Sequence, residues 1–154
     1  MNRRSSLLLF IFVLFMTFVI AGCTAKPAEE VASQKITLYK SQTCGCCALY
    51  TKYMVNKGYP LEVKDMQNMA PIKEQYQIPA SMQSCHTVEI GGYFVEGHIP
   101  LEAVEKMMKE KPDIRGIAMP GMPSGSPGMP GSPSDEFIVY AVKKDGTFTE
   151  FMRI

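Results

Sequence analysis

Three cysteines within four residues constrain this 154-residue chain more than any other feature. The run Cys44-Gly45-Cys46-Cys47 directly follows a strand-like segment, residues 35–40, and precedes a helical pattern. Thiols at a strand-to-helix junction meet unpaired backbone N–H groups and the positive end of the helix dipole, and both lower a thiol pKa. Thiolates bind soft metal ions and attack disulfides, so the sequence predicts either a metal site or a thiol–disulfide site.

The first 22 residues have the pattern of an export signal. Arg3 and Arg4 precede an apolar stretch over residues 7–20, and small residues follow it. This stretch has about 14 residues, fewer than the roughly 20 that span a bilayer. Residues 20–23, Ile-Ala-Gly-Cys, resemble the bacterial lipobox, which implies that Cys23 becomes a lipidated N-terminus. The alternatives are a plain signal peptide with a free Cys23 and an uncleaved anchor.

We therefore expect a signal peptide over residues 1–22, a polar, alanine-rich tether over 23–34, and one folded domain over 35–154. The expected location is the cell envelope, lipid-anchored and facing the periplasm or the outer side of the membrane. Without Arg3 and Arg4, 14 of the 16 basic side chains remain against 15 acidic ones. This balance argues against nucleic acid or anionic lipid as a partner, because such contacts need clustered positive charge.

The patterning of the folded part predicts an α/β domain with a core large enough not to need disulfides. Strands are expected at 36–39, 61–64, 88–90 and 93–95, and helices at 44–57, 69–76 and 101–111. Gly91-Gly92 predicts a tight hairpin turn, and Pro112 ends the last helix. An irregular loop rich in Gly, Pro and Met follows over residues 116–134, before a second hairpin that extends the sheet over 137–142 and 147–152.

The order strand, helix, strand, helix, hairpin, helix, with cysteines at the start of the first helix, resembles the thioredoxin fold. A crossover through one helix predicts that the first two strands are parallel, with a right-handed connection. The resemblance further implies that Pro79 corresponds to the cis-proline that faces the active site in that fold.

Four motifs carry a more specific resemblance. They are residues 44–47 (Cys-Gly-Cys-Cys), 84–87 (Ser-Cys-His-Thr), 96–100 (Glu-Gly-His-Ile-Pro) and 116–123 (Gly-Ile-Ala-Met-Pro-Gly-Met-Pro). In this order they resemble the thioredoxin-like CopG-type family. Its members are small exported metal-binding proteins associated with copper resistance, long catalogued as a domain of unknown function. The resemblance implies copper binding at the cysteine cluster.

Copper also fits the residue chemistry, because thiolates and thioethers hold Cu(I) and imidazole can assist. Cys44 and Cys47 are three residues apart and share a helix face, whereas Cys46 is expected to point elsewhere, toward a second metal or a neighbouring loop. Cys85 is the candidate for the fourth sulfur. Zinc is the alternative, in a closed tetrahedral set of Cys44, Cys46 or Cys47, Cys85 and a histidine. We favour copper because of the soft thiolates and the supply of methionines.

The histidines and loop methionines are further candidates. His98 precedes a helix at a loop end, where sites are often built, and is a candidate metal ligand. If a regular strand runs through Cys85 and His86, these side chains face opposite ways, so His86 either supports the ligands from behind or is exposed. Met119 and Met122 can deliver or shield soft copper, or they can be adaptable packing residues.

Two function classes use the same sulfurs. In the first, the protein sequesters or relays Cu(I) at the envelope, with the copper ion and another copper-handling protein as partners. In the second, it is a thiol oxidoreductase in which Cys44 attacks and Cys47 resolves. Cys46 favours the metal site over the oxidoreductase. A dithiol enzyme needs only two thiols, and a third thiol nearby would form incorrect disulfides with them. A hybrid would reduce Cu(II) and keep the product, and a purely structural domain would hold Cys44–Cys47 and Cys46–Cys85 disulfides.

Overall fold

The computed structural model describes residues 34–133 and 136–154, so the expected signal peptide, Cys23 and nearly all of the tether lie outside the described residues. Within the described ranges, no helix is long and apolar enough to cross a membrane. The elements, in chain order, are β1 (Ile36–Ser41), α3 (Gly45–Asn56), β2 (Glu62–Met66), α4 (Ala70–Gln75), η1 (Ala80–Met82), β3 (His86–Ile90), β4 (Tyr93–Glu96), α5 (Leu101–Glu110), β5 (Gly116–Ala118), β6 (Ile138–Val142) and β7 (Phe148–Arg153).

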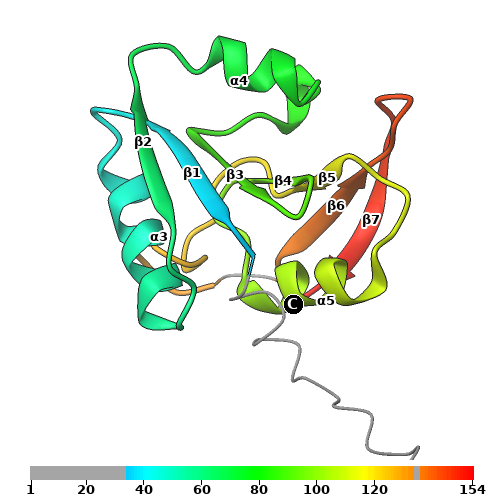
Figure 1. Ribbon diagram of the computed structural model, residues 1–154. Helices are drawn as coiled ribbons and strands as arrows, with labels where there is room; N and C mark the ends of the chain where they lie inside the picture. The colour runs from blue at the N-terminus through cyan, green and yellow to red at the C-terminus, as the bar shows by residue number, and fades with distance from the viewer. Residues whose placement is uncertain (1–33, 134–135) are drawn as a thin grey trace, which may run out of the picture.

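All seven described strands form one open mixed sheet in the order β2-β1-β3-β4-β5-β6-β7 (Figure 1). β1 pairs with β2 in parallel, as the helical crossover between them predicts. β4 and β5 are also parallel, and the other four pairings are antiparallel. The C-terminal hairpin therefore extends the sheet, as expected.

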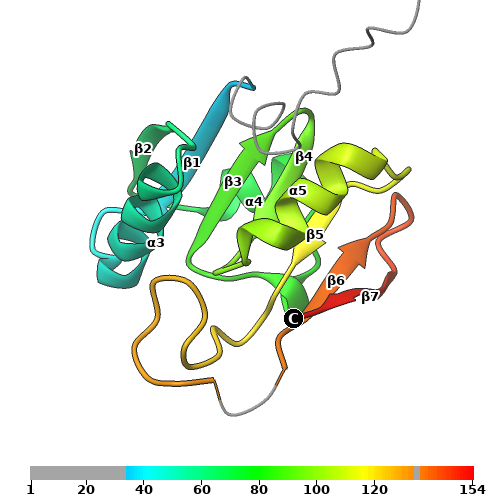
Figure 2. The same ribbon diagram turned by 90° about the horizontal axis from the view of Figure 1, so that it is seen from below.

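Helices α3 and α5 cover one face of this sheet and α4 covers the other (Figures 1 and 2). The main core lies between the sheet and helices α3 and α5, where Leu38, Tyr50 and Met107 are fully buried. A smaller apolar cluster around Phe94 and Ile78 lies with the other face. Burial of these side chains is the main driving force for the fold, at about 1.5–3 kcal/mol for each large apolar residue.

Turn and cap residues act where the sequence predicts. Helix α3 ends at Asn56, and Gly58 follows with a φ of 88°, a left-handed conformation that glycine adopts at little cost. Gly91 and Gly92 have φ of 56° and 84° in the tight turn between β3 and β4. The helix and strand predictions up to residue 111 are thereby confirmed to within two residues at each boundary.

Two expectations about the fold are wrong. Residues 116–118 are not part of the irregular loop but form β5, which joins β4 to β6. A three-residue strand is too short to show a hydrophobic period, so the sequence does not reveal it. Pro79 has no cis peptide bond; it stands before η1 rather than directly before β3. Most X–Pro bonds in folded proteins are trans, and Ser84 and Cys85 occupy the approach to the strand instead.

Candidate metal centre

The first turn of α3 forms one side of the site. β1 ends at Ser41, and the Cys44 N–H donates to the Ser41 carbonyl at 3.1 Å, which turns the chain into the helix. Cys44 is the N-cap residue, and its Sγ accepts from the backbone N–H of Cys47 at 3.3 Å. The cap satisfies one of the free N–H groups of the first turn and places Cys44 beside Cys47.

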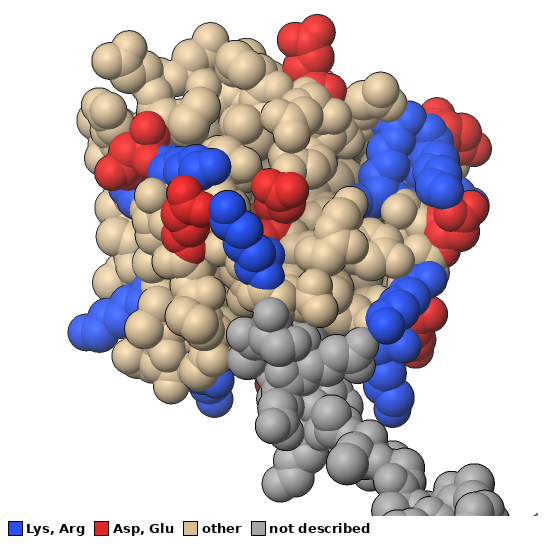
Figure 3. Space-filling model, viewed as in Figure 1, with Lys and Arg blue, Asp and Glu red and all other residues tan. Residues whose placement is uncertain are grey.

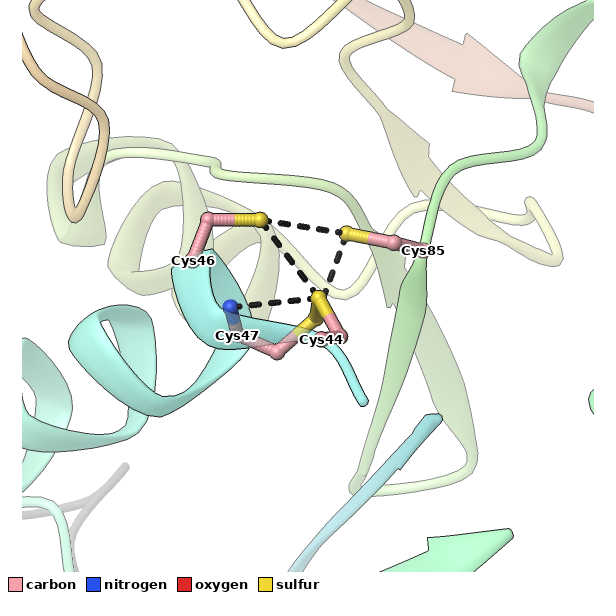
Figure 4. A group of neighbouring side chains, drawn as sticks. All are labelled: Cys44, Cys46, Cys47 and Cys85. Carbon is pink, nitrogen blue, oxygen red and sulfur yellow. Dashed lines mark hydrogen bonds between the residues drawn. A yellow bond between two sulfur atoms is a disulfide. The ribbon is translucent and has the colours of Figure 1, made fainter. Parts of the chain in front are cut away.

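The four cysteines of the folded domain point toward one another (Figure 4). Cys44 and Cys47 form a disulfide, and Cys46 and Cys85 are free thiols. The Cys85 Sγ lies 3.2 Å from the Cys47 Sγ and 3.8 Å from the Cys46 Sγ, and the Cys46 Sγ lies 3.4 Å from the Cys44 Sγ. All four sulfurs lie within 4.8 Å of one another, a spacing that allows them to share metal ions.

The position of Cys46 agrees with one of the two alternatives expected for it. Its sulfur reaches the neighbouring loop that carries Cys85 rather than a separate site. It also lies beside Cys44, because the helix begins at Gly45 and the extended backbone of Cys44 brings the Cys44 side chain back toward Cys46. Of the two disulfides expected for a purely structural domain, Cys44–Cys47 is formed, whereas Cys46 and Cys85 are both free.

Cys85 enters the cluster from the segment just before β3. Burial, together with the neighbouring Cys46, raises the pKa of the Cys85 thiol to about 12. Without a metal ion, Cys85 is therefore a protonated thiol at neutral pH, and a metal that binds its sulfur must displace the proton.

His98 is buried with a defined tautomer. Its Nδ1 lies 2.7 Å from the Pro127 carbonyl, which can only accept, so Nδ1 carries the hydrogen. The lone pair is then on Nε2, which lies 4.0 Å from the Cys85 Sγ. Metal-binding histidines commonly donate their other ring N–H in this way. Burial lowers the pKa of His98, which keeps the ring neutral and able to act as a ligand.

His86 is fully buried, so of the two alternatives stated for it, exposure is wrong. Its Nδ1 lies 3.7 Å from the Cys85 Sγ, because β3 begins at His86 and no regular strand separates the two side chains onto opposite faces. Its ring packs against those of Tyr50 and His98. Burial, with His98 nearby, lowers the pKa of His86 to about 3. Cys85, His86 and His98 thus form a second group with ligand atoms within 4.8 Å.

The two loop methionines lie in different places. Met122 is partly exposed, has a φ of 47°, and places its Sδ 3.7 Å from the Cys85 Sγ. Met119 is buried in the main core, so it is a packing residue. The loop returns over α3 at Gly128, where an added Cβ would lie 2.7 Å from the Tyr50 backbone nitrogen. The loop after β5, residues 119–133 and called the Met-rich loop below, therefore covers one side of the cluster.

A buried ion pair behind Cys85 was not predicted from the sequence. The Lys73 Nζ on α4 lies 2.5 Å from Glu96 Oε1, and both side chains are almost fully buried. Glu96 and Thr87 do belong to two of the motifs that resemble the CopG-type family, which is a signal that more than the cysteines and histidines is required there. Lys73 has no comparable signal, because a lysine in an amphipathic helix is usually exposed.

The donor set fits soft metal ions. Four sulfurs, one neutral imidazole and an adjacent thioether are ligands that select Cu(I) over hard cations. Zinc would accept four of the same donors, but the six together exceed a closed tetrahedron. In the disulfide form only Cys46 and Cys85 offer thiols, so the full set requires reduction of Cys44–Cys47.

Comparisons with known proteins agree with this chemistry. Residues 82–129 match the family model described as "Protein of unknown function, DUF411". A solved structure titled "Copper resistance protein copG- Form 1" is 35% identical with a TM-score of 0.72, covering 78% of this chain and 96% of that one. A second, titled "Form 2", is 34% identical with a TM-score of 0.72, covering 79% and 98%. No curated protein matches the chain.

Proposed function

The chain belongs to the CopG-type family, whose domain is described as one of unknown function, and on that premise we propose that it binds Cu(I) and so protects the cell envelope from copper. The observation that carries the proposal is the convergence of four cysteine sulfurs within 4.8 Å of one another. Soft Cu(I) prefers such thiolates, and bridging sulfurs can hold more than one ion. The protein would sequester the ion or relay it to another copper-handling protein.

The proposed ligands are Cys44, Cys46, Cys47 and Cys85, with His98 supplying Nε2. His86 supports them from the buried side, and Met122 adds a thioether at the edge of the cluster. A thioether needs no deprotonation, so it is available to copper when the Cys85 thiol is still protonated.

The arrangement that holds these ligands is proposed to be thioredoxin-like. Four of the strands run in the order β2-β1-β3-β4, with β1 parallel to β2 and the following pairs antiparallel. The cysteine run lies at the start of the helix that follows β1. Lipidation at Cys23 would attach this domain to a membrane facing the periplasm or the outer side.

An anaerobic titration of the reduced protein tests the proposal. The reduced protein should bind Cu(I) at least about a hundredfold tighter than Zn(II), on the order of 3 kcal/mol, because thiolates favour the softer ion. The form with Cys44 and Cys47 oxidised serves as the control, since it has lost two thiols and should bind more weakly. Equal affinities for the two metals, or copper binding that survives loss of Cys44, Cys46 and Cys47 together, would rule the proposal out.

The Cys44–Cys47 disulfide favours a second candidate, a thiol oxidoreductase in which Cys44 attacks and Cys47 resolves. Coupled to copper, the dithiol would reduce two Cu(II) ions to two Cu(I), forming the disulfide and releasing two protons. Cys44→Ser should then abolish turnover, whereas Cys46→Ser should leave it. Stoichiometric binding of copper supplied as Cu(II), without any oxidation of the thiols, would exclude this copper-coupled reaction.

A further inference from the structure

The carboxylate of Glu96 lies behind Cys85 and accepts hydrogen bonds from residues on both sides of it. The backbone N–H of Ser84, one residue before Cys85, donates to Glu96 Oε1 at 2.5 Å. The hydroxyl of Thr87, two residues after Cys85, donates to Glu96 Oε2 at 2.8 Å. One carboxylate therefore holds both ends of the segment that carries Cys85 and His86.

Lys73 completes this arrangement from α4. Its Nζ donates to Glu96 Oε1 at 2.5 Å and to Thr87 Oγ1 at 2.8 Å. The Glu96 and Thr87 residues are fully buried, and the Lys73 side chain is 6% exposed. All three oxygens and the ammonium are thus paired within a buried network that links α4, β3 and β4.

Such a network is expensive if stability alone is its role. Removing two charges from water costs several kcal/mol per ion, and replacing a buried pair with well-packed apolar residues is often neutral or stabilising. Directional bonds from a buried pair do, however, fix the position of what they hold. Here they hold the residues on either side of the one cysteine that reaches the cluster from a different part of the chain.

We propose that Glu96, locked by Lys73, is a positioning residue that holds the Cys85 sulfur against the Cys44-Cys46-Cys47 cluster for metal binding. The inference rests on the proposed copper function and extends it to residues that touch no metal. It also explains why Thr87 and Glu96 occur in motifs together with Cys85 and His98. Without the hydrogen bonds to Glu96, the Cys85 thiol is still present, but its sulfur is no longer held beside the other three.

A double-mutant cycle separates positioning from general stability. We would measure Cu(I) affinity, by competition with a chromophoric Cu(I) chelator, in the reduced full-length protein and in Glu96→Gln, Cys85→Ser and the double variant. Glu96→Gln should weaken binding about tenfold, but by less than about twofold when Cys85 is already serine. The same loss in both backgrounds, or no loss in either, would overturn the proposal.

Glu89→Gln is the matched control. Glu89 lies on the same hairpin and accepts a hydrogen bond from Tyr39, and among the described residues it forms no hydrogen bond or ion pair with residues 84–87. Its substitution should leave copper affinity unchanged. If Glu96→Gln does not fold, Thr87→Val removes the hydrogen bond from Thr87 to Glu96 and leaves the Lys73–Glu96 ion pair in place. That variant should weaken copper binding several-fold only when Cys85 is present, and wild-type affinity in it would equally overturn the proposal.

A copper-free measurement distinguishes failure of this inference from failure of the proposed function. In the oxidised Cys23→Ser/Cys46→Ser protein, Cys85 is the only free thiol. Adding Glu96→Gln should speed its alkylation by iodoacetamide at least about threefold at fixed pH, because the segment is no longer held. If the wild type bound no copper but this acceleration were seen, the function would be wrong and the positioning right. An unchanged alkylation rate would reject the positioning.

Discussion

At the scale of single residues, Cys85 joins distant parts of the chain into one site. It lies 39 residues from Cys46 in sequence, and 3.8 Å separates their sulfurs. The sequence predicts this meeting from the resemblance to a known fold and family. It does not predict the ion pair behind Cys85, because buried lysines are rare and nothing local distinguishes Lys73 from an exposed one.

Cys85→Ser tests the fourth sulfur. As a ligand, Cys85 contributes to copper affinity, so the variant should bind Cu(I) roughly tenfold more weakly or worse, about 1.4 kcal/mol. The melting of the metal-free reduced protein should change little. If Cys85 were only a buried hydrophobe, copper affinity would hold and the metal-free protein would instead lose about 1 kcal/mol from burying a hydroxyl. Competition titration and thermal melting of the one variant measure both quantities.

His86 should make the metal-free protein sensitive to acid. Burial lowers the pKa of His86 to about 3 in the folded protein, and a histidine in the unfolded chain titrates near 6.5. Below about pH 6.5 the unfolded chain takes up a proton at His86 that the folded protein does not. The free energy of unfolding therefore keeps its full value above about pH 6.5 and decreases as the pH falls toward 3, by about 2 kcal/mol between pH 7 and 5. Urea unfolding of the reduced protein at the two pH values measures this loss.

His86→Phe is the comparison for the acid effect, since it keeps a ring against Tyr50 and cannot titrate. Its stability should fall less between pH 7 and 5 than that of the wild type. His98 also has a lowered pKa, so some dependence should remain. An equal fall in the two proteins would mean that His86 is not held neutral.

At the scale of elements, the site is formed where four separate segments meet: the first turn of α3, the approach to β3, the connection from β4 to α5 that carries His98, and the Met-rich loop. The repeating apolar positions of α3 and the Gly91-Gly92 turn make the first two predictable in outline. The position of the loop was not predictable, because Gly/Pro-rich sequence has no period and its path depends on tertiary contacts. Those contacts are the bond from His98 to Pro127 and the approach of Gly128 to α3.

Gly128→Ala tests whether the loop must lie against α3. Gly128 has a φ of 81°, and an added Cβ would lie 2.7 Å from the Tyr50 nitrogen, so the loop would have to move away. Gly121→Ala is the matched control, because Gly121 has a φ of 85° and open space around it. Both variants carry the backbone strain, but only Gly128→Ala should lose a further 1–3 kcal/mol or so in urea unfolding. Equal losses would mean that the contact with α3 contributes nothing.

At the scale of the whole molecule, the surface has no dominant sign of charge. Basic and acidic side chains are interspersed over the face in Figure 3. Ion pairs of the domain include Lys40 with Asp65 and Lys106 with Glu110. With 14 basic against 15 acidic side chains after residue 22, electrostatic attraction to anionic lipid headgroups would be weak. Any stable attachment of this domain to a membrane should therefore come from covalent lipid or from an apolar N-terminal anchor.

Cys23→Ser separates these two modes of attachment. If the lipobox-like residues direct lipidation, the variant loses the acyl chains, each buried CH₂ of which contributes about 0.8 kcal/mol to membrane binding. The protein should then move from the membrane to the soluble fraction, or accumulate as a precursor with its signal intact. Fractionation, with the mass of the N-terminal peptide, measures both. Serine at position 23 removes the lipid and leaves the apolar segment unchanged. If the wild type and the variant both stay in the membrane with residues 1–22 attached, the apolar segment is therefore the anchor.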